Sequence, residues 1–229
     1  MSMRSGLERK FEQEMRESFF EKANGLIASE EQFRKAEDTQ LVGIESEVAI
    51  SPSNGKMEDL EAIRDAIINE VGEGADKELG AGQIEIRNPK PFDILSNNGL
   101  GNLTKEYAAM LRMLTKAAHT RGYSVLRVGA NPFLPIKDTP RTSKPKYRQV
   151  PDFYNTNRGS HVNTLIGLGA TQVDIGFAEV VSLFQSFQVN IEARSFADAI
   201  DKMNRSFVVA PYLLALGGNA RYLNCVDTH

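Results

Sequence analysis

The chain has 229 residues, of which 41% are hydrophobic and 25% are charged, as expected for a soluble globular protein with a sizeable core. Its formal net charge of −3 excludes a strong general attraction to nucleic acid or anionic membranes, and no apolar run is long enough to span a bilayer. The single cysteine, Cys225, excludes an internal disulfide framework, so we expect a cytoplasmic protein without nucleic-acid or membrane partners.

Residues 1–38 are expected to form a helical lead-in to a core that spans residues 40–220, both within one domain of residues 1–229. Apolar residues recur every four positions over residues 5–24, which predicts an amphipathic helix. A capping-box pattern at residues 29–32 predicts that a short second helix starts there.

The alternating pattern of residues 40–51 predicts a strand with one apolar face and one polar face. Glu45 and Glu47 share the polar face, roughly 6–7 Å apart at the spacing of a strand. Carboxylates this close repel each other unless a cation lies between them. The strand is therefore either a solvated edge with two surface glutamates or part of a cation site.

A second strand with the same design is predicted at residues 83–88, where Glu85 faces away from two isoleucines. A glycine-rich stretch that contains Glu78 comes before it. Helices are predicted at residues 57–71 and 102–121, and a further strand at residues 123–128.

The later part of the chain combines a basic segment, a strand and a helix. In residues 130–160, prolines alternate with lysines and arginines, which predicts a loop that is either a solvated connection or a cover over anionic phosphates. The next strand is predicted to place Gln188 and Asn190 on its polar face. Ser195 is expected to cap a helix that continues through Phe207, and Pro211 is expected to mark a break.

We therefore predict an α+β fold, in which a largely antiparallel sheet has helices on one side and a functional polar face on the other. If the polar-faced strands are neighbours, Glu45, Glu47 and Glu85 share one surface with the nearby Glu78. Carboxylate oxygens suit Mg²⁺ or Mn²⁺, which bridge the phosphates of ATP during phosphoryl transfer. The sequence has neither a Walker-type loop nor a dinucleotide-binding glycine motif.

Three blocks of sequence occur in order over residues 40–220. They are Val42-Gly43-Ile44-Glu45-Ser46-Glu47-Val48, then Glu78 with Gln83-Ile84-Glu85-Ile86, and then Gln188-Val189-Asn190-Ile191 followed by Pro211-Tyr212-Leu213-Leu214-Ala215-Leu216-Gly217-Gly218-Asn219-Ala220. Together they resemble the glutamate–cysteine ligase family, and the pattern around Gln188 is closest to its plant-type and related bacterial branch.

The resemblance implies a fold related to glutamine synthetase, with a curved antiparallel sheet, and a magnesium-dependent ligase that uses ATP. It implies that ATP phosphorylates the γ-carboxylate of L-glutamate and that the amine of L-cysteine then attacks the γ-glutamyl phosphate. The products are γ-glutamylcysteine, ADP and phosphate, and the reaction is the first step of glutathione synthesis.

The resemblance also assigns roles to individual residues. Glu45 is expected to face the nucleotide-side metals, whereas Glu47, Glu78 and Glu85 are expected to bind the metal nearer the amino-acid substrates. Gln188 stands where many members of the family have a metal-binding histidine, and its amide offers an uncharged oxygen ligand.

Candidate substrate-binding residues are Asn190, Arg87 and Asn219. Asn219 matches the asparagine of the family's A-N-S-P segment, although Ala220 and Arg221 replace the serine and proline of that segment. We assign no nucleotide-binding residue, and no catalytic residue beyond the metal ligands.

Members of the family are expected to continue well beyond the A-N-S-P segment, whereas this sequence ends nine residues after Ala220. We therefore expect the N-terminal half of such a ligase, with an incomplete fold, or a shortened homologue, or a chain that self-association or a partner completes. Two functional alternatives stay open: another ligase that joins glutamate to a different amine, and a truncated non-catalytic homologue that binds a metal or a partner.

Overall fold

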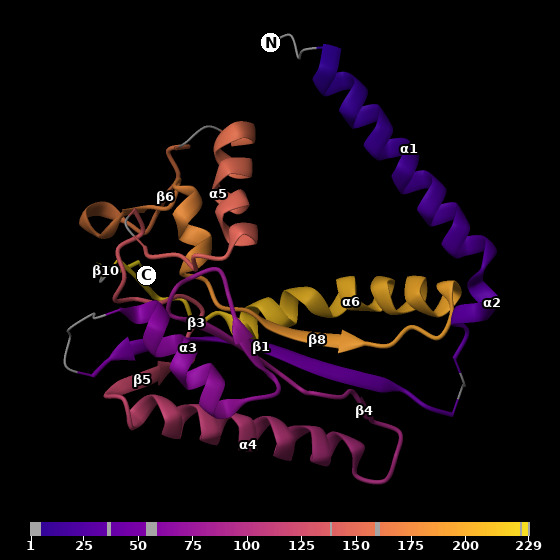
Figure 1. Cartoon of the computed structure of the whole chain (residues 1–229), viewed down its shortest axis with the longest axis horizontal. Helices are drawn as coiled ribbons and strands as arrows, with labels where there is room; N and C mark the ends of the chain where they lie inside the picture. Colours follow the sequence, from indigo (N-terminus) through magenta and orange to yellow (C-terminus); the bar gives the residue numbers. More distant parts are fainter. Residues whose placement is uncertain are drawn as a thin grey trace. The chain divides into compact units, whose positions relative to one another are not determined.

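The computed structural model of the chain describes residues 6–35, 38–53, 59–137, 139–158, 161–224 and 226–228 (Figure 1). The chain divides into two compact units, which are described separately. The first unit consists of Met1–Thr39 and Glu192–Pro211, and the second consists of Gln40–Ile191 and Tyr212–His229. The single domain expected from the sequence stays a prediction.

The first unit contains helix α1 (Gly6–Ala28), helix α2 (Glu30–Phe33) and most of helix α6 (Phe196–Gly217). Ser195 caps α6 as predicted, because its hydroxyl accepts a hydrogen bond from the backbone N–H of Asp198 at 3.1 Å. The carboxylate of Asp198 accepts in turn from the N–H of Arg194 at 2.8 Å. The capping box predicted for α2 is absent, since the Ser29 hydroxyl donates instead to the carbonyl of Gly25 at 2.7 Å.

The second unit is built around one long strand, β1 (Leu41–Pro52), which pairs directly with four others (Figure 1). One edge of β1 pairs with β3 (Gln83–Arg87) and β4 (Phe92–Asp93), and the other edge pairs with β8 (Phe187–Ile191) and β5 (Tyr123–Leu126). Strand β2 (Ala75–Lys77) pairs with the outer edge of β3. Every pairing is antiparallel, which confirms the predicted α+β class.

Helices α3 (Leu60–Val71) and α4 (Gly99–His119) pack on one face of this sheet. The core between them includes Val48, Ile50, Ile67, Ile84 and Leu114, each at most 1% exposed. Burial of each such side chain stabilises the fold by about 1.5–3 kcal/mol. Because side chains alternate along a strand, the polar residues between these apolar ones point to the opposite face.

Smaller elements complete the second unit. They are the pair β6 (Leu165–Ile166) and β7 (Val173–Asp174), the pair β9 (Tyr222–Leu223) and β10 (Val226–Asp227), helix α5 (Pro145–Arg158), and two 3₁₀ turns, η1 (Gly169–Thr171) and η2 (Ala178–Ser182). Among the described residues, no helix combines the length and apolar character needed to cross a membrane.

The structure corrects two predictions, a loop over residues 130–160 and a helix break at Pro211. The prediction of a loop throughout residues 130–160 is wrong, because residues 145–158 form α5, and Pro145 stands in its first turn, where the missing N–H of proline costs nothing. Pro211 does not end α6, which continues to Gly217. The carbonyl of Phe207 loses its partner there, but Phe207 is 69% exposed, so that water can reach this turn.

Strand β8 alternates as predicted, but its apolar side chains are not buried. Phe187, Val189 and Ile191 are 58%, 52% and 51% exposed. Phe187 contacts the ring of Tyr107 of α4, with 5.9 Å between the ring centroids. The pattern therefore gives the faces of β8 but not how far each face is covered.

Candidate functional site

Strand β1 brings the predicted acidic residues to one face of the sheet. Glu47 lies directly opposite Glu85 of β3, and Glu45 lies between Arg87 of β3 and Gln188 of β8. Side chains opposite each other in antiparallel strands have Cβ atoms roughly 4.5–5.5 Å apart. The condition left open by the sequence, that these strands are neighbours, is therefore met, because β3 and β8 flank β1 with their polar faces aligned.

Both carboxylate oxygens of Glu47 are held by one residue that the sequence analysis missed. Ser186 donates its hydroxyl to Oε1 at 2.7 Å and its backbone N–H to Oε2 at 2.9 Å. The backbone N–H of Glu47 donates back to the carbonyl of Ser186 at 2.8 Å. Ser186 comes just before β8, so only the pairing of β8 with β1 gives it this role.

Glu85 is paired within its own strand. Its Oε1 atom lies 2.6 Å from Nη1 of Arg87, and the Glu85 and Arg87 side chains are 19% and 44% exposed. An ion pair this accessible to solvent contributes about 1 kcal/mol or less. Because the ion pair is this weak, Glu85 can exchange Arg87 for a cation, and Arg87 can exchange Glu85 for an anionic substrate group.

Glu78 lies in the turn between β2 and β3, close enough to Glu47 and Glu85 for electrostatic repulsion between the carboxylates. Its pKa is raised by burial and by the charges of Glu47 and Glu85. Hydrogen bonds from the Leu79 backbone N–H and the Tyr147 hydroxyl partly offset this effect. Three carboxylates thus share one region, and burial together with the charges of its neighbours makes Glu78 harder to ionise than an isolated glutamate.

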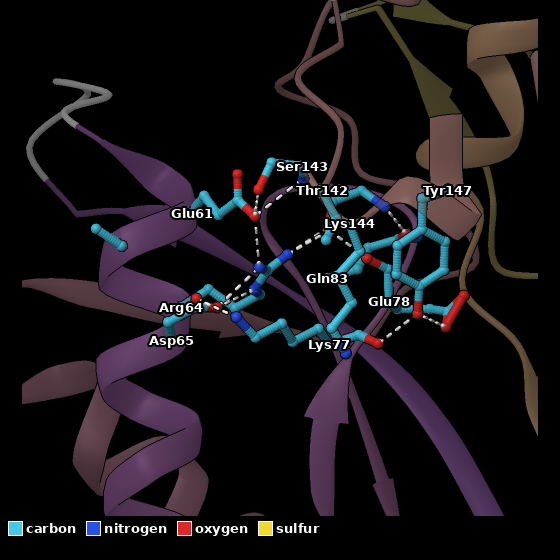
Figure 2. Close-up of polar contacts among 12 residues, drawn as sticks. Glu61, Arg64, Asp65, Lys77, Glu78, Gln83, Thr142, Ser143, Lys144 and Tyr147 are labelled. Atoms are coloured by element: carbon cyan, nitrogen blue, oxygen red, sulfur yellow. Dashed lines mark hydrogen bonds and ion pairs between the residues drawn. The ribbon is translucent and has the colours of Figure 1, made fainter. Parts of the chain in front are cut away.

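The basic segment that leads into α5 docks on the turn that carries Glu78 (Figure 2). The hydroxyl of Thr142 donates to the carbonyl of Glu78, and the backbone N–H of Thr142 donates to the carbonyl of Leu79 at 2.9 Å. The Tyr147 hydroxyl contacts the Lys77 carbonyl at 2.7 Å and Oε2 of Glu78 at 3.3 Å. Residues 142–147 therefore support the acidic site and are not a solvated connection.

Arg64 of α3 supports this segment from beneath (Figure 2). Its side chain is 0% exposed, and its Nη1 atom donates to the hydroxyl of Thr142 and, at 3.3 Å, to the carbonyl of Gly80. Its Nε atom donates to Asp65 at 3.0 Å and its Nη2 atom to Glu61 at 3.2 Å. A buried guanidinium with its donors satisfied in this way links the core helix to the acidic turn.

The donor chemistry of the site fits a hard divalent cation, because its side chains offer carboxylate oxygens. In the part of the chain that the structure describes, no three Asp, Glu, His or Cys side chains are arranged around a common ion position. The carboxylates of Glu47, Glu85 and Glu78 contact Ser186, Arg87 and Tyr147 instead. An ionised carboxylate has about four acceptor positions, so these contacts leave room for a cation, and the role as ligands stays a prediction.

Within the described part of the chain, the structure connects only one of the other candidates directly to this cluster. Gln188 donates its amide to the Ser186 hydroxyl at 3.0 Å, which connects it to the residue that holds Glu47. Asn190 is exposed and opposite Gly43. Asn219 lies beside Gly129, where an added Cβ would come within 2.6 Å of its Oδ1 atom. Their roles in substrate binding stay predictions.

A separate cavity of about 270 Å³ lies away from these residues. Its lining is formed by Pro135, Ile136, Lys137, Gln172, Val173, Asp174, Phe177, Asn224 and Val226. It contains none of the candidate metal or substrate residues.

Comparison with protein families gives one result that covers the sheet and the site. The family model of glutamate-cysteine ligase family 2 matches residues 41–229, from the first residue of β1 onward. The match includes every candidate site residue. A search of curated proteins gave no match.

Proposed function

The chain belongs to glutamate-cysteine ligase family 2, a family of ligases, and we propose that it joins L-glutamate to L-cysteine at the expense of ATP. The product is γ-glutamylcysteine, the first intermediate of glutathione synthesis, and the reaction takes place in the cytoplasm. The antiparallel sheet around β1 then corresponds to part of a glutamine-synthetase-like fold.

The observation that carries this proposal is the close approach of Glu47, Glu78 and Glu85 on one face of the sheet. A carboxylate is a poor electrophile until one of its oxygens becomes a phosphate leaving group. ATP and the γ-carboxylate of glutamate are both anions, and they must come into contact for the phosphoryl group to be transferred. Bound Mg²⁺ or Mn²⁺ would offset the repulsion between them. The pKa of Glu78 is raised by burial and by the charges of Glu47 and Glu85, so the group has the negative charge that such a cation needs.

We propose separate roles in cation binding and substrate binding for the candidate residues of this chain. Glu47, Glu78 and Glu85 would hold the cation near the amino acids, with Gln188 as an uncharged neighbour, and Glu45 would face the nucleotide. The Arg87 guanidinium is 44% exposed and suits a carboxylate of the substrate, which it can bind through two parallel hydrogen bonds. Asn190 and Asn219 would offer amide groups for orientation of the substrate.

Phosphate release tests this proposal. Incubation of the protein with ATP, Mg²⁺ and glutamate should release phosphate at a rate that depends on the added amine, and cysteine should give the highest rate. A higher rate with another amine would make the protein a different glutamate ligase. No release with any amine, together with retained metal binding, would indicate a non-catalytic homologue.

Substitution of the acidic residues gives a second test. Glu47→Gln and Glu85→Gln should each lower turnover more than about 100-fold, because loss of a ligand should exceed the loss caused by a supporting residue. Glu70→Gln is the matched control, since Glu70 lies on α3, is 46% exposed and pairs with Arg121. Unfolding of both site variants would show that these glutamates are structural and would contradict the proposed site.

A further inference from the structure

We propose that strand β8 pairs with β8 of a second copy of this chain, so that the two sheets join edge to edge across a twofold axis. The inference concerns the outer edge of β8, which the proposed reaction does not use, and it is independent of that reaction. It is carried by the free backbone groups of this edge, by the exposed apolar side chains beside it, and by the order of residues along the strand.

The outer edge of β8 is free in the part of the chain that the structure describes. The backbone N–H of Glu47 donates to the carbonyl of Ser186 at 2.8 Å, so the backbone of Ser186 faces β1. Because backbone groups alternate in direction along a strand, those of Gln188 and Asn190 also face β1, and those of residues 187, 189 and 191 face away. Within the described residues, β8 pairs with no strand other than β1, so these outward N–H and carbonyl groups are available to a further strand.

The side chains beside this edge are apolar and exposed. Phe187, Val189 and Ile191 are each more than half exposed, on the face of β8 that contacts α4 through Phe187. Residues 187–191 contain neither a charged residue nor a proline, which are two of the features that keep edge strands from pairing with other chains. The edge therefore favours the addition of another strand.

The order of residues makes β8 complementary to itself in an antiparallel pair centred on Val189. In that register Val189 lies opposite Val189 of the second copy, and Phe187 lies opposite Ile191. Gln188 lies opposite Asn190 on the other face. Apolar side chains thus meet apolar ones, amides meet amides, and no like charges oppose each other within the strand. The outward backbone groups meet as hydrogen-bonded pairs, and a contact that uses the same patch on both copies closes as a dimer.

Sedimentation equilibrium of the whole chain tests the inference. The unmodified protein should dimerise, and Val189→Lys should raise the dissociation constant of the dimer more than about tenfold, because two ammonium groups would face each other at the axis. Val189 is exposed in the single subunit, so the lysine should leave the fold intact, which circular dichroism checks. Val208→Lys is the matched control, because Val208 is a 71% exposed valine of α6, and this variant should dimerise normally.

Charge reversal separates this register from any other self-association. Val189→Glu alone should dimerise as weakly as Val189→Lys, whereas a mixture of the two variants should form a heterodimer, because opposite charges then meet at the axis. A mixture that does not associate would overturn the proposed pairing, as would an unmodified protein that is monomeric at concentrations up to about 100 μM. A dimer that persists in Val189→Lys, or that Val208→Lys dissociates, would overturn it as well, because the contact would then lie outside β8.

Discussion

At the scale of single residues, the support of the acidic site depends most on Arg64. This guanidinium is fully buried, and it contacts two acidic side chains of its own helix, a threonine of the basic segment and the carbonyl of Gly80. Burial of a charge is costly unless all its donors are satisfied, so each of these contacts matters to the fold. Only the planar fork of an arginine can reach such separate partners at once.

Arg64→Lys should therefore lower the free energy of unfolding by about 2 kcal/mol, although the charge is kept. A single ammonium group cannot reach both Asp65 and Thr142, and one of them loses its partner. Urea denaturation measures the change. Arg205→Lys is the control, because Arg205 is 78% exposed and pairs with Asp201 on α6, and it should stay within about 0.5 kcal/mol.

Asp65 predicts how stability depends on pH. Burial raises its pKa, but hydrogen bonds and charges from Lys77 and Arg64 outweigh this, so the net pKa lies below its usual value. A lowered pKa in the folded state stabilises the protein above the unfolded value of about 3.9, and this contribution is lost as pH falls through the folded pKa. Asp65→Asn should therefore be less stable at pH 7 and should lose less stability on acidification, as measured by urea denaturation from pH 7 to pH 3. An unchanged pH profile would contradict this assignment.

At the scale of elements, the turn between β2 and β3 has little room for change. A Cβ at Gly80 would lie 2.4 Å from the carbonyl oxygen of Ser182 and 2.8 Å from Oε1 of Gln83. Gly80 also donates its N–H to that Gln83 oxygen at 2.7 Å. The same turn carries Glu78, so a shift of the backbone at Gly80 would also move the acidic site.

Gly80→Ala should therefore lower the free energy of unfolding by about 1–3 kcal/mol, because the backbone of Ser182 must move. Gly25→Ala is the control, since nothing lies within 4 Å of a Cβ there and the residue is inside α1. That control should leave stability unchanged or slightly raised. Thermal unfolding of both variants measures the difference, and equal stability of the two would contradict the predicted clash.

The sequence was most informative where local pattern alone decides structure. Alternation along β1 and β3 predicted the apolar face that is buried at Val48, Ile50 and Ile84, and it placed Glu45, Glu47 and Glu85 on the opposite face. It did not predict that Ala49 and Gln83, on the polar faces, are buried as well. Composition was misleading for α5, where prolines and lysines favoured a loop although Pro145 is well placed at a helix start. Local pattern also could not show that the apolar side of β8 stays largely exposed, because coverage depends on distant elements.

At the scale of the whole molecule, the site depends on contacts between residues far apart in the sequence. Ser186 holds Glu47 across 139 residues, and Tyr147 reaches Glu78 across 69 residues. Neither Ser186 nor Tyr147 belongs to a local motif, so the sequence could predict the carboxylates but not the residues that contact them. The fold places both in reach, because β8 pairs with the strand that carries Glu47 and the first turn of α5 contacts the turn that carries Glu78.

Oxygen transfer from glutamate to phosphate tests the central claim most directly. If the γ-carboxylate of glutamate attacks ATP and cysteine then displaces phosphate, one carboxylate oxygen must leave with that phosphate. Glutamate labelled with ¹⁸O in its γ-carboxylate should therefore give phosphate that contains one ¹⁸O atom, detected by mass spectrometry, when ATP, Mg²⁺ and cysteine are present. Unlabelled phosphate would indicate simple hydrolysis of ATP and would contradict the account.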